Sequence, residues 1–319
     1  MGIVVIGDVF IDIKGFSTST YIPYGRNLGT IEQIHGGVGR NVAEDIANVE
    51  LEPIFIGAVD DDSIGEDVIQ KLNRHKVDTR YMKKVKNGMG TWLAVFDHKG
   101  DVVASVSKRP DHKPMSEILD EHGDEIFKNA DSIAIEIDMD QDVTKKTFAY
   151  AEKYNKKVYA LVSNMSIAIE RRDFIRKTGC FVCNQQEAGI LFSEDYENIT
   201  PEELCAILQD RIRSAKIPQM VVTMGKAGAV YATLEGDAGV YPALKVDVVD
   251  TTGAGDAFFS GVCIGLTYGK TLREACGIGT RLASTVICTS ENICPRFMPE
   301  EFGITKENLA PSPSSLFSA

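Results

Sequence analysis

The residues with the clearest chemical potential lie in the stretch DTTGAGDAFFSG at positions 250–261. Gly253, Ala254 and Gly255 precede the acid Asp256, at the head of an apolar segment that we expect to be helical. The first turn of a helix has unpaired amide N–H groups and a partial positive charge, so it attracts anions. Glycine has no Cβ, which lets a phosphate approach the backbone closely. The stretch therefore predicts an oxyanion cradle at a helix N-terminus.

Asp256 would stand beside the phosphate held in this cradle. A carboxylate in that place can accept the proton of a hydroxyl that attacks phosphorus. The alternative is that Asp256 only stabilises the start of the helix. Because the helix dipole favours an ionised carboxylate, we do not expect a high proton affinity for Asp256. Orientation of the hydroxyl and neutralisation of charge would then supply most of the acceleration.

Segments typical of strands and helices alternate along most of the chain. Apolar runs predict strands at 3–13, 52–62, 132–138, 157–163, 179–184 and 219–225. The spacing of apolar residues favours helices at 41–50, 64–76, 144–155 and 201–215. This order indicates an α/β protein whose mostly parallel sheet has helices on both faces. In such sheets ligands bind at the carboxyl ends of the strands.

Two extended stretches interrupt the alternation. Residues 14–35 are polar and glycine-rich, and residues 89–109 have the pattern of a hairpin with a turn at HKGD. They could form a small separate sheet, or they could be two independent surface excursions. The last residues, NLAPSPSSLFSA, have the composition of a loose tail.

Composition limits the partners of the chain. Its 319 residues include 34 Lys and Arg against 46 Asp and Glu, a net charge of −12. This charge argues against a general binder of nucleic acid or of an anionic membrane surface, and leaves a small-molecule partner. The start lacks the pattern of a secretory signal, and seven irregularly spaced cysteines suit reduced thiols. We therefore expect a cytoplasmic protein.

The motif at 250–261 resembles the C-terminal signature of the ribokinase, or PfkB-type, family of sugar and nucleoside kinases. HGGVGRNVAE at 35–44 resembles the family's N-terminal di-glycine motif. The resemblance implies a ribokinase-like three-layer fold with a small β-sheet lid. On this basis residues 1–303 would be the kinase domain, with a lid from about 14–35 and 89–109, and residues 304–319 a C-terminal tail.

The same resemblance implies roles on the phosphate side of the site. Asp256 matches the catalytic base, and Gly253, Ala254 and Gly255 match the anion hole. Other matching positions are Asn184 and Glu187 for ATP phosphates and for Mg²⁺ through water, Thr223, Gly225 and Gly228 for the turn along the nucleotide, and Asp250 and Thr252 for a monovalent cation, which could be K⁺. For Glu187 the alternative is an ordinary solvated helix residue.

On the acceptor side, Asp12, Gly37 and Asn41 match residues that bind the substrate hydroxyls. A strand-end turn for Asp12 and a helix N-cap for Asn41 are the structural alternatives. Arg40, in GGVGRN, resembles pseudouridine-kinase-like members and is assigned to substrate binding, with a surface helix residue as the alternative. Phe10 could stack on a sugar ring or a base, or fill the core.

Taken together, the motifs predict an ATP- and Mg²⁺-dependent kinase that phosphorylates a hydroxyl, primary by expectation, of a small sugar or sugar derivative. A nucleoside kinase is the main alternative. A non-catalytic ligand sensor and an ADP-dependent kinase are further ones. The lid of such a protein could also join two copies of the chain into a homodimer.

Overall fold

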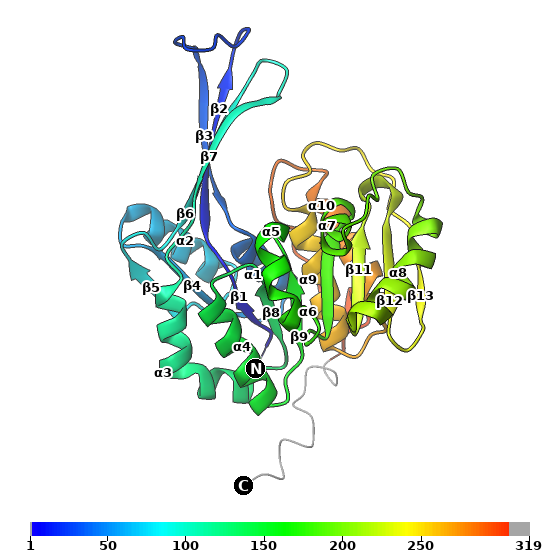
Figure 1. The fold of residues 1–319 in the computed structure, drawn as a ribbon. Coiled ribbons are helices and arrows are strands. Elements are labelled where there is room, and N and C mark those ends of the chain that lie inside the picture. Colours follow the sequence, from blue (N-terminus) through cyan, green and yellow to red (C-terminus); the bar gives the residue numbers. More distant parts are fainter. Residues whose placement is uncertain (1, 306–319) are drawn as a thin grey trace.

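The body of the protein is a nine-stranded sheet (Figure 1). The computed structural model describes residues 2–305, so the expected tail at 304–319 lies almost wholly outside the described residues. The strand order is β13-β12-β11-β10-β9-β8-β1-β4-β5. The strands are β1 Val4–Ile6, β4 Ile54–Asp60, β5 Met82–Val85, β8 Ile133–Glu136, β9 Val158–Leu161, β10 Cys180–Asn184, β11 Gln219–Thr223, β12 Ala229–Thr233 and β13 Ala238–Tyr241. Only β11–β12 and β12–β13 are antiparallel, which confirms the mostly parallel sheet.

Helices cover both faces of this sheet. One face carries α1 Val38–Asn48, α2 Ser63–Arg74, α9 Ala254–Thr267 and α10 Leu272–Val286. The other carries α3 Lys113–Asn129, α4 Gln141–Lys153, α7 Gln185–Phe192 and α8 Pro201–Ala215, with the short helices α5 Met165–Ala168 and α6 Arg172–Ile175. Strand alternation divides the core: in β1, Val5 packs into the first cluster, and Val4 and Ile6 pack into the second. The three-layer fold is confirmed.

Small residues bring α9 and α10 into close contact. A Cβ at Gly261 would lie 2.4 Å from the backbone N of Gly279, and one at Gly265 would lie 2.7 Å from Ala275. Glycine is required at these two positions because the helix backbones meet there. The helix that begins with the GAGD stretch is thus fixed firmly against its neighbour.

The two extended stretches form one small sheet of order β3-β2-β6-β7. Its strands are β2 Phe10–Ser17, β3 Gly29–Gly36, β6 Gly90–Phe96 and β7 Val102–Lys108. The pairs β2–β3 and β6–β7 are antiparallel, and β2–β6 is parallel. In Figure 1 this sheet projects away from the body. The expected small sheet is confirmed, and we call it the lid sheet; β2 begins at Phe10, before the predicted boundary.

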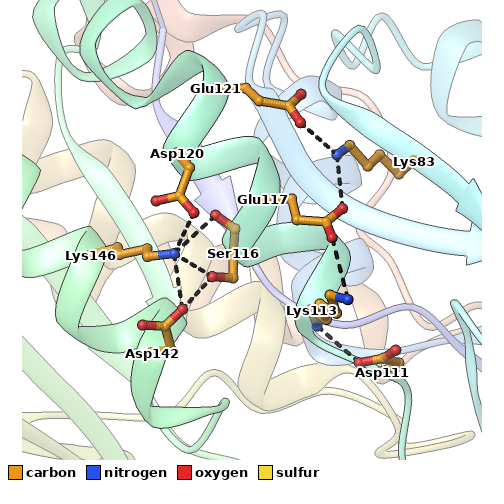
Figure 2. Close-up of polar contacts among 9 residues, drawn as sticks. All are labelled: Lys83, Asp111, Lys113, Ser116, Glu117, Asp120, Glu121, Asp142 and Lys146. Carbon is orange, nitrogen blue, oxygen red and sulfur yellow. Dashed lines mark hydrogen bonds and ion pairs between the residues drawn. The ribbon is translucent and has the colours of Figure 1, made fainter.

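A network of charged side chains joins α3 to its neighbours (Figure 2). Lys146 of α4 contacts Asp120 of α3 at 2.7 Å and Asp142 at 3.0 Å. Lys83 of β5 contacts Glu117 and Glu121 of α3. Because these carboxylates are largely exposed, each pair contributes at most about 1 kcal/mol to stability. Across residues 2–305 no helix is long and apolar enough to cross a membrane.

Candidate active site

The N-terminus of α9 is built around Gly253. Gly253 is the N-cap with φ 81°, and no side chain caps the helix. A Cβ at Gly253 would lie 2.1 Å from the carbonyl oxygen of Asn292, so only glycine fits. A Cβ at Gly255 would meet no atom within 4 Å. The first-turn amides of Gly255 and Asp256 have no acceptor within the helix, and the space beside Gly255 has room for an oxyanion.

Asp256 lies at the contact between α9 and α1. Asn41 Nδ2 donates a hydrogen bond to Asp256 Oδ2 at 2.6 Å. Burial raises the pKa of Asp256 to about 6, and the charge of Asp12 adds to this, while Asn41 and Arg40 oppose it. The expectation that Asp256 would not have a high proton affinity was wrong, because desolvation raises its pKa by more than the helix dipole lowers it. The pKa still leaves Asp256 mostly ionised at neutral pH.

The di-glycine motif forms the tight connection between β3 and α1. Gly37 has φ 97°, and a Cβ there would lie 2.5 Å from the carbonyl oxygen of Asp8. A Cβ at Gly36 would lie 2.5 Å from Asp12 Oδ2. Asp12 sits within β2 and not at a strand-end turn, and burial raises the pKa of its carboxyl. Asn41 lies inside α1, whose N-cap is Gly37, so the N-cap interpretation of Asn41 was also wrong.

Arg40 is buried, contrary to the surface-residue alternative. Its side chain has no exposed area and forms an ion pair of 2.5 Å with Glu44. Nε donates to the carbonyl oxygen of Gly36 at 3.3 Å, and Nη2 donates to that of His35. Three of its hydrogen bonds thus go to protein groups of β3 and α1. These contacts hold the β3–α1 turn, and the assignment of Arg40 to substrate binding stays a prediction.

Asn184 and Glu187 form the N-terminal capping box of α7. Asn184 Oδ1 accepts from the Glu187 amide at 2.8 Å, and Glu187 Oε2 accepts from the Asn184 amide at 2.7 Å. Glu187 is therefore not an ordinary solvated residue, and burial raises the pKa of its carboxyl. Its Oε1 atom makes no hydrogen bond to any residue that the structure describes. Asn184 pairs with Thr223 in the β10–β11 register, which brings these predicted residues together.

Two cavities run from this strand edge to the head of α9. One, of about 1150 Å³, is lined by Asn184, Thr223, Gly225 and Gly255. The other, of about 670 Å³, shares Thr223, Gly225 and Gly255 with the first and extends past Gly228. Gly225 and Gly228 have φ of 55° and 99°, so the turn between them depends on glycine. The predicted nucleotide-side residues thus lie along one groove that ends at the α9 amides.

The sequence model described as pfkB family carbohydrate kinase matches residues 2–295. The chain belongs to this family. Guanosine-inosine kinase of Exiguobacterium acetylicum is 34% identical over 292 residues, covering 91% of this chain and 95% of the relative. Pseudouridine kinase of Escherichia coli is 24% identical over 88% of this chain and 90% of the relative.

Solved structures agree with this family membership at the level of the fold. The ribokinase of Arabidopsis thaliana, solved with ribose and ATP, has a TM-score of 0.79 at 18% identity and covers 97% of this chain and 99% of its own. The ribokinase of Thermotoga maritima has a TM-score of 0.73 at 19% identity, covering 94% and 98%. The ribokinase-like fold predicted from the motifs is confirmed.

The second cavity of this PfkB chain is lined by residues that the motifs did not indicate. Its apolar wall comprises Ala243, Leu244, Val246, Val248, Phe258, Ala283 and Ile287, with the hydroxyls of Thr280 and Ser284. They come from an irregular segment after β13, from α9 and from α10 with its C-cap, and no local pattern joins these segments. The sequence feature that could have indicated this wall is the number of apolar residues in 243–249, because an irregular segment at the surface is usually polar.

Asn292 joins the two sides of the site in this family member. Its Nδ2 donates to the carbonyl oxygen of His35 at 2.8 Å, and its own carbonyl lies against Gly253. The segment that follows is tied to α1, because Asp45 accepts from the Cys294 amide at 2.7 Å and Asn48 donates to the Cys294 carbonyl at 2.6 Å. The di-glycine turn and the α9 amides are thus held in one fixed arrangement.

Asp250 and Thr252 form a local turn before α9. The Thr252 amide and hydroxyl donate to Asp250 Oδ1 at 2.9 and 2.8 Å. Within residues 2–305 no group of three or more His, Cys, Asp or Glu residues is arranged to hold a metal ion. The monovalent-cation role of this PfkB pair stays a prediction.

Proposed function

We propose that the chain is an ATP-dependent kinase that phosphorylates a primary hydroxyl of a sugar or a nucleoside. One observation carries the proposal: Asp256 follows Gly255, which lines the groove past Thr223, and its carboxylate is bonded to Asn41 and senses the charge of Asp12 on the acceptor side. A base in that position serves the transfer of a phosphoryl group to an alcohol. The intact base and cradle favour an enzyme over a ligand sensor.

The groove fits ATP. Its apolar wall around Leu244 and Phe258 suits a purine, and the glycine turn at 225–228 lets phosphates approach the backbone. Mg²⁺ usually keeps several waters and needs few protein ligands, which suits the free oxygen of Glu187 and the lack of an acidic cluster among residues 2–305. Bound ATP supplies the phosphoryl group, and Mg²⁺ neutralises its charge. Asn184 and Glu187 would hold the metal through water.

The chain's own residues then direct the transfer. Asn41 fixes Asp256 Oδ2, which leaves Oδ1 to accept the proton of the attacking hydroxyl. The oxygen of that hydroxyl forms a bond to the γ-phosphorus as the bond to the ADP oxygen breaks. The amides of Gly255 and Asp256 stabilise the charge on the phosphoryl oxygens. Asp12, with an acceptor carboxylate on the lid sheet, is placed to bind vicinal hydroxyls of the substrate.

Three finer proposals remain with this function. Asp250 and Thr252 would bind a monovalent cation, K⁺ being the candidate. The outer face of the lid sheet would join two copies of the chain, a proposal supported by the exposure of Ile31, Leu93 and Val106 there. A cytoplasmic location is supported by the free thiols of all seven cysteines.

The test is ADP release from ATP and Mg²⁺ with a panel of acceptors. The panel contains ribose, deoxyribose, fructose, a deoxy-sugar acid, inosine, guanosine, uridine and pseudouridine. We expect at least one acceptor to give equal amounts of ADP and of a phosphomonoester, identified by ³¹P NMR. Bound ATP without ADP release for any acceptor would contradict the function. Inorganic phosphate in place of a phosphomonoester would mean hydrolysis instead of transfer.

A further inference from the structure

The lid sheet places aromatic rings beside Asp12. In the parallel β2–β6 register, Phe10 pairs with Gly90, Asp12 with Trp92, and Phe16 with Phe96. Paired residues on neighbouring strands project from the same face of a sheet. This face, which we call the inner lid face, therefore carries Trp92 next to Asp12.

The inner lid face is the one turned toward the acceptor side of the site. The Asp12 carboxylate lies against Gly36 of the di-glycine turn, and its charge acts on Asp256. Alternate residues project from the opposite face, where Leu93 pairs with Ile13 and Val106 and has 43% of its surface exposed. Trp92 thus faces the acceptor and Leu93 faces away from it.

The ring of Trp92 is partly exposed and packs against the aromatic row of the lid sheet. Phe96 meets it edge-on, with centroids 6.3 Å apart and planes at 88°, and Phe96 is itself stacked on Phe16 at 4.8 Å. On the hinge side, the ring of Phe10 stands over Gly90, where a Cβ would lie 2.4 Å from the ring. Among residues 2–305 no other ring and no cation packs on half-buried Trp92. Its indole is therefore held by Phe96 and keeps part of its surface exposed on the lid sheet.

We propose that the acceptor is a nucleoside, whose base stacks on Trp92 while Asp12 binds the ribose diol and Asp256 receives the proton of the 5′-hydroxyl. The inference rests on the proposed function, which it narrows to one substrate class. Neighbouring strands are about 4.8 Å apart, so a ribose held at Asp12 lies within reach of Trp92 on the next strand. A planar base stacks on an indole over a larger area than the ring of a free sugar does.

The first experiment uses the fact that Trp92 is the chain's single tryptophan. Inosine, guanosine, uridine, pseudouridine and ribose are each titrated without ATP while the tryptophan emission is recorded. We expect saturable quenching with at least one nucleoside and no change with ribose. No response to any nucleoside, or an equal response to ribose, would overturn the proposal. This readout does not depend on catalysis.

The second experiment compares Trp92→Ala and Trp92→Phe with the matched control Leu93→Ala on the opposite face. Loss of one base–aromatic stack predicts that Trp92→Ala raises KM for the nucleoside about 5- to 150-fold. Trp92→Phe should retain most of the affinity for the nucleoside. Leu93→Ala should leave the KM for the nucleoside unchanged. Trp92→Ala should leave any KM for ribose unchanged. An unchanged nucleoside KM in Trp92→Ala would overturn the proposal. ADP release with ribose and with no nucleoside would also overturn the nucleoside proposal, but the proposed kinase function would stand. No ADP release with any acceptor would instead contradict the proposed function.

Discussion

The pKa of the Asp256 carboxylate depends on residues that are distant in the sequence. Its sequence neighbours place it in the first turn of α9, where the helix dipole would lower its pKa. Its spatial neighbours bury it, and its pKa rises to about 6. Asn41 opposes this rise by donating a hydrogen bond to the ionised form. The chemistry of the acid could be predicted from the motif, but its titration depends on how α1 packs against α9.

The pH dependence of turnover tests this environment. Asp256 must be ionised to accept a proton, so we expect kcat/KM to rise with pH through about 6 and to level off above it. Asn41→Leu removes the hydrogen bond that lowers the pKa, so the midpoint should move to higher pH. ATP itself also titrates in this range, but it does so equally in the assays of both proteins. The difference between the variant and the wild type therefore reports on Asp256. A midpoint that is the same in both proteins would show that another group limits the rate.

At the scale of elements, the site depends on where helix α9 begins. Close packing on α10 at Gly261 and contact of Gly253 with the Asn292 carbonyl fix that position. Both glycines next to Asp256 were predicted to serve phosphate approach. The structure shows that the two glycines have different roles. Gly253 has a conformation and a contact that require glycine, whereas Gly255 has neither.

Alanine at these two glycines should therefore have different effects. Gly255→Ala should leave the melting temperature unchanged or slightly higher, because alanine is favoured over glycine in a helix by about 1 kcal/mol. Its methyl group would occupy the space where phosphate binds, so kcat/KM for ATP should fall by about tenfold or more. Gly253→Ala should lower the melting temperature, since φ 81° and the Asn292 carbonyl both oppose a Cβ. Wild-type turnover in Gly255→Ala would contradict the claim that the phosphate binds at the backbone beside Gly255.

At the scale of the whole molecule, periodicity and turn residues were enough to predict the α/β body and both helical layers, whereas the small sheet was predicted only by the family resemblance. These features follow from local preferences and from burial of one face of each element. The partners across that small sheet could not be predicted, because the pairing of 10–17 with 90–96 is set by long-range packing. The burial of Arg40 beside Glu44 and the packing of 243–248 opposite α10 have the same long-range cause, so no local pattern indicated them.

The central claim is that α9 amides hold the transferred phosphoryl group while Asp256 receives the proton of the acceptor. Asp256→Asn tests it most directly, because asparagine has the same shape but cannot accept that proton. With the best acceptor of the panel, we predict that kcat falls by at least about 10²-fold while the affinity for ATP stays at the wild-type value. A variant that turns over near the wild-type rate would contradict the account.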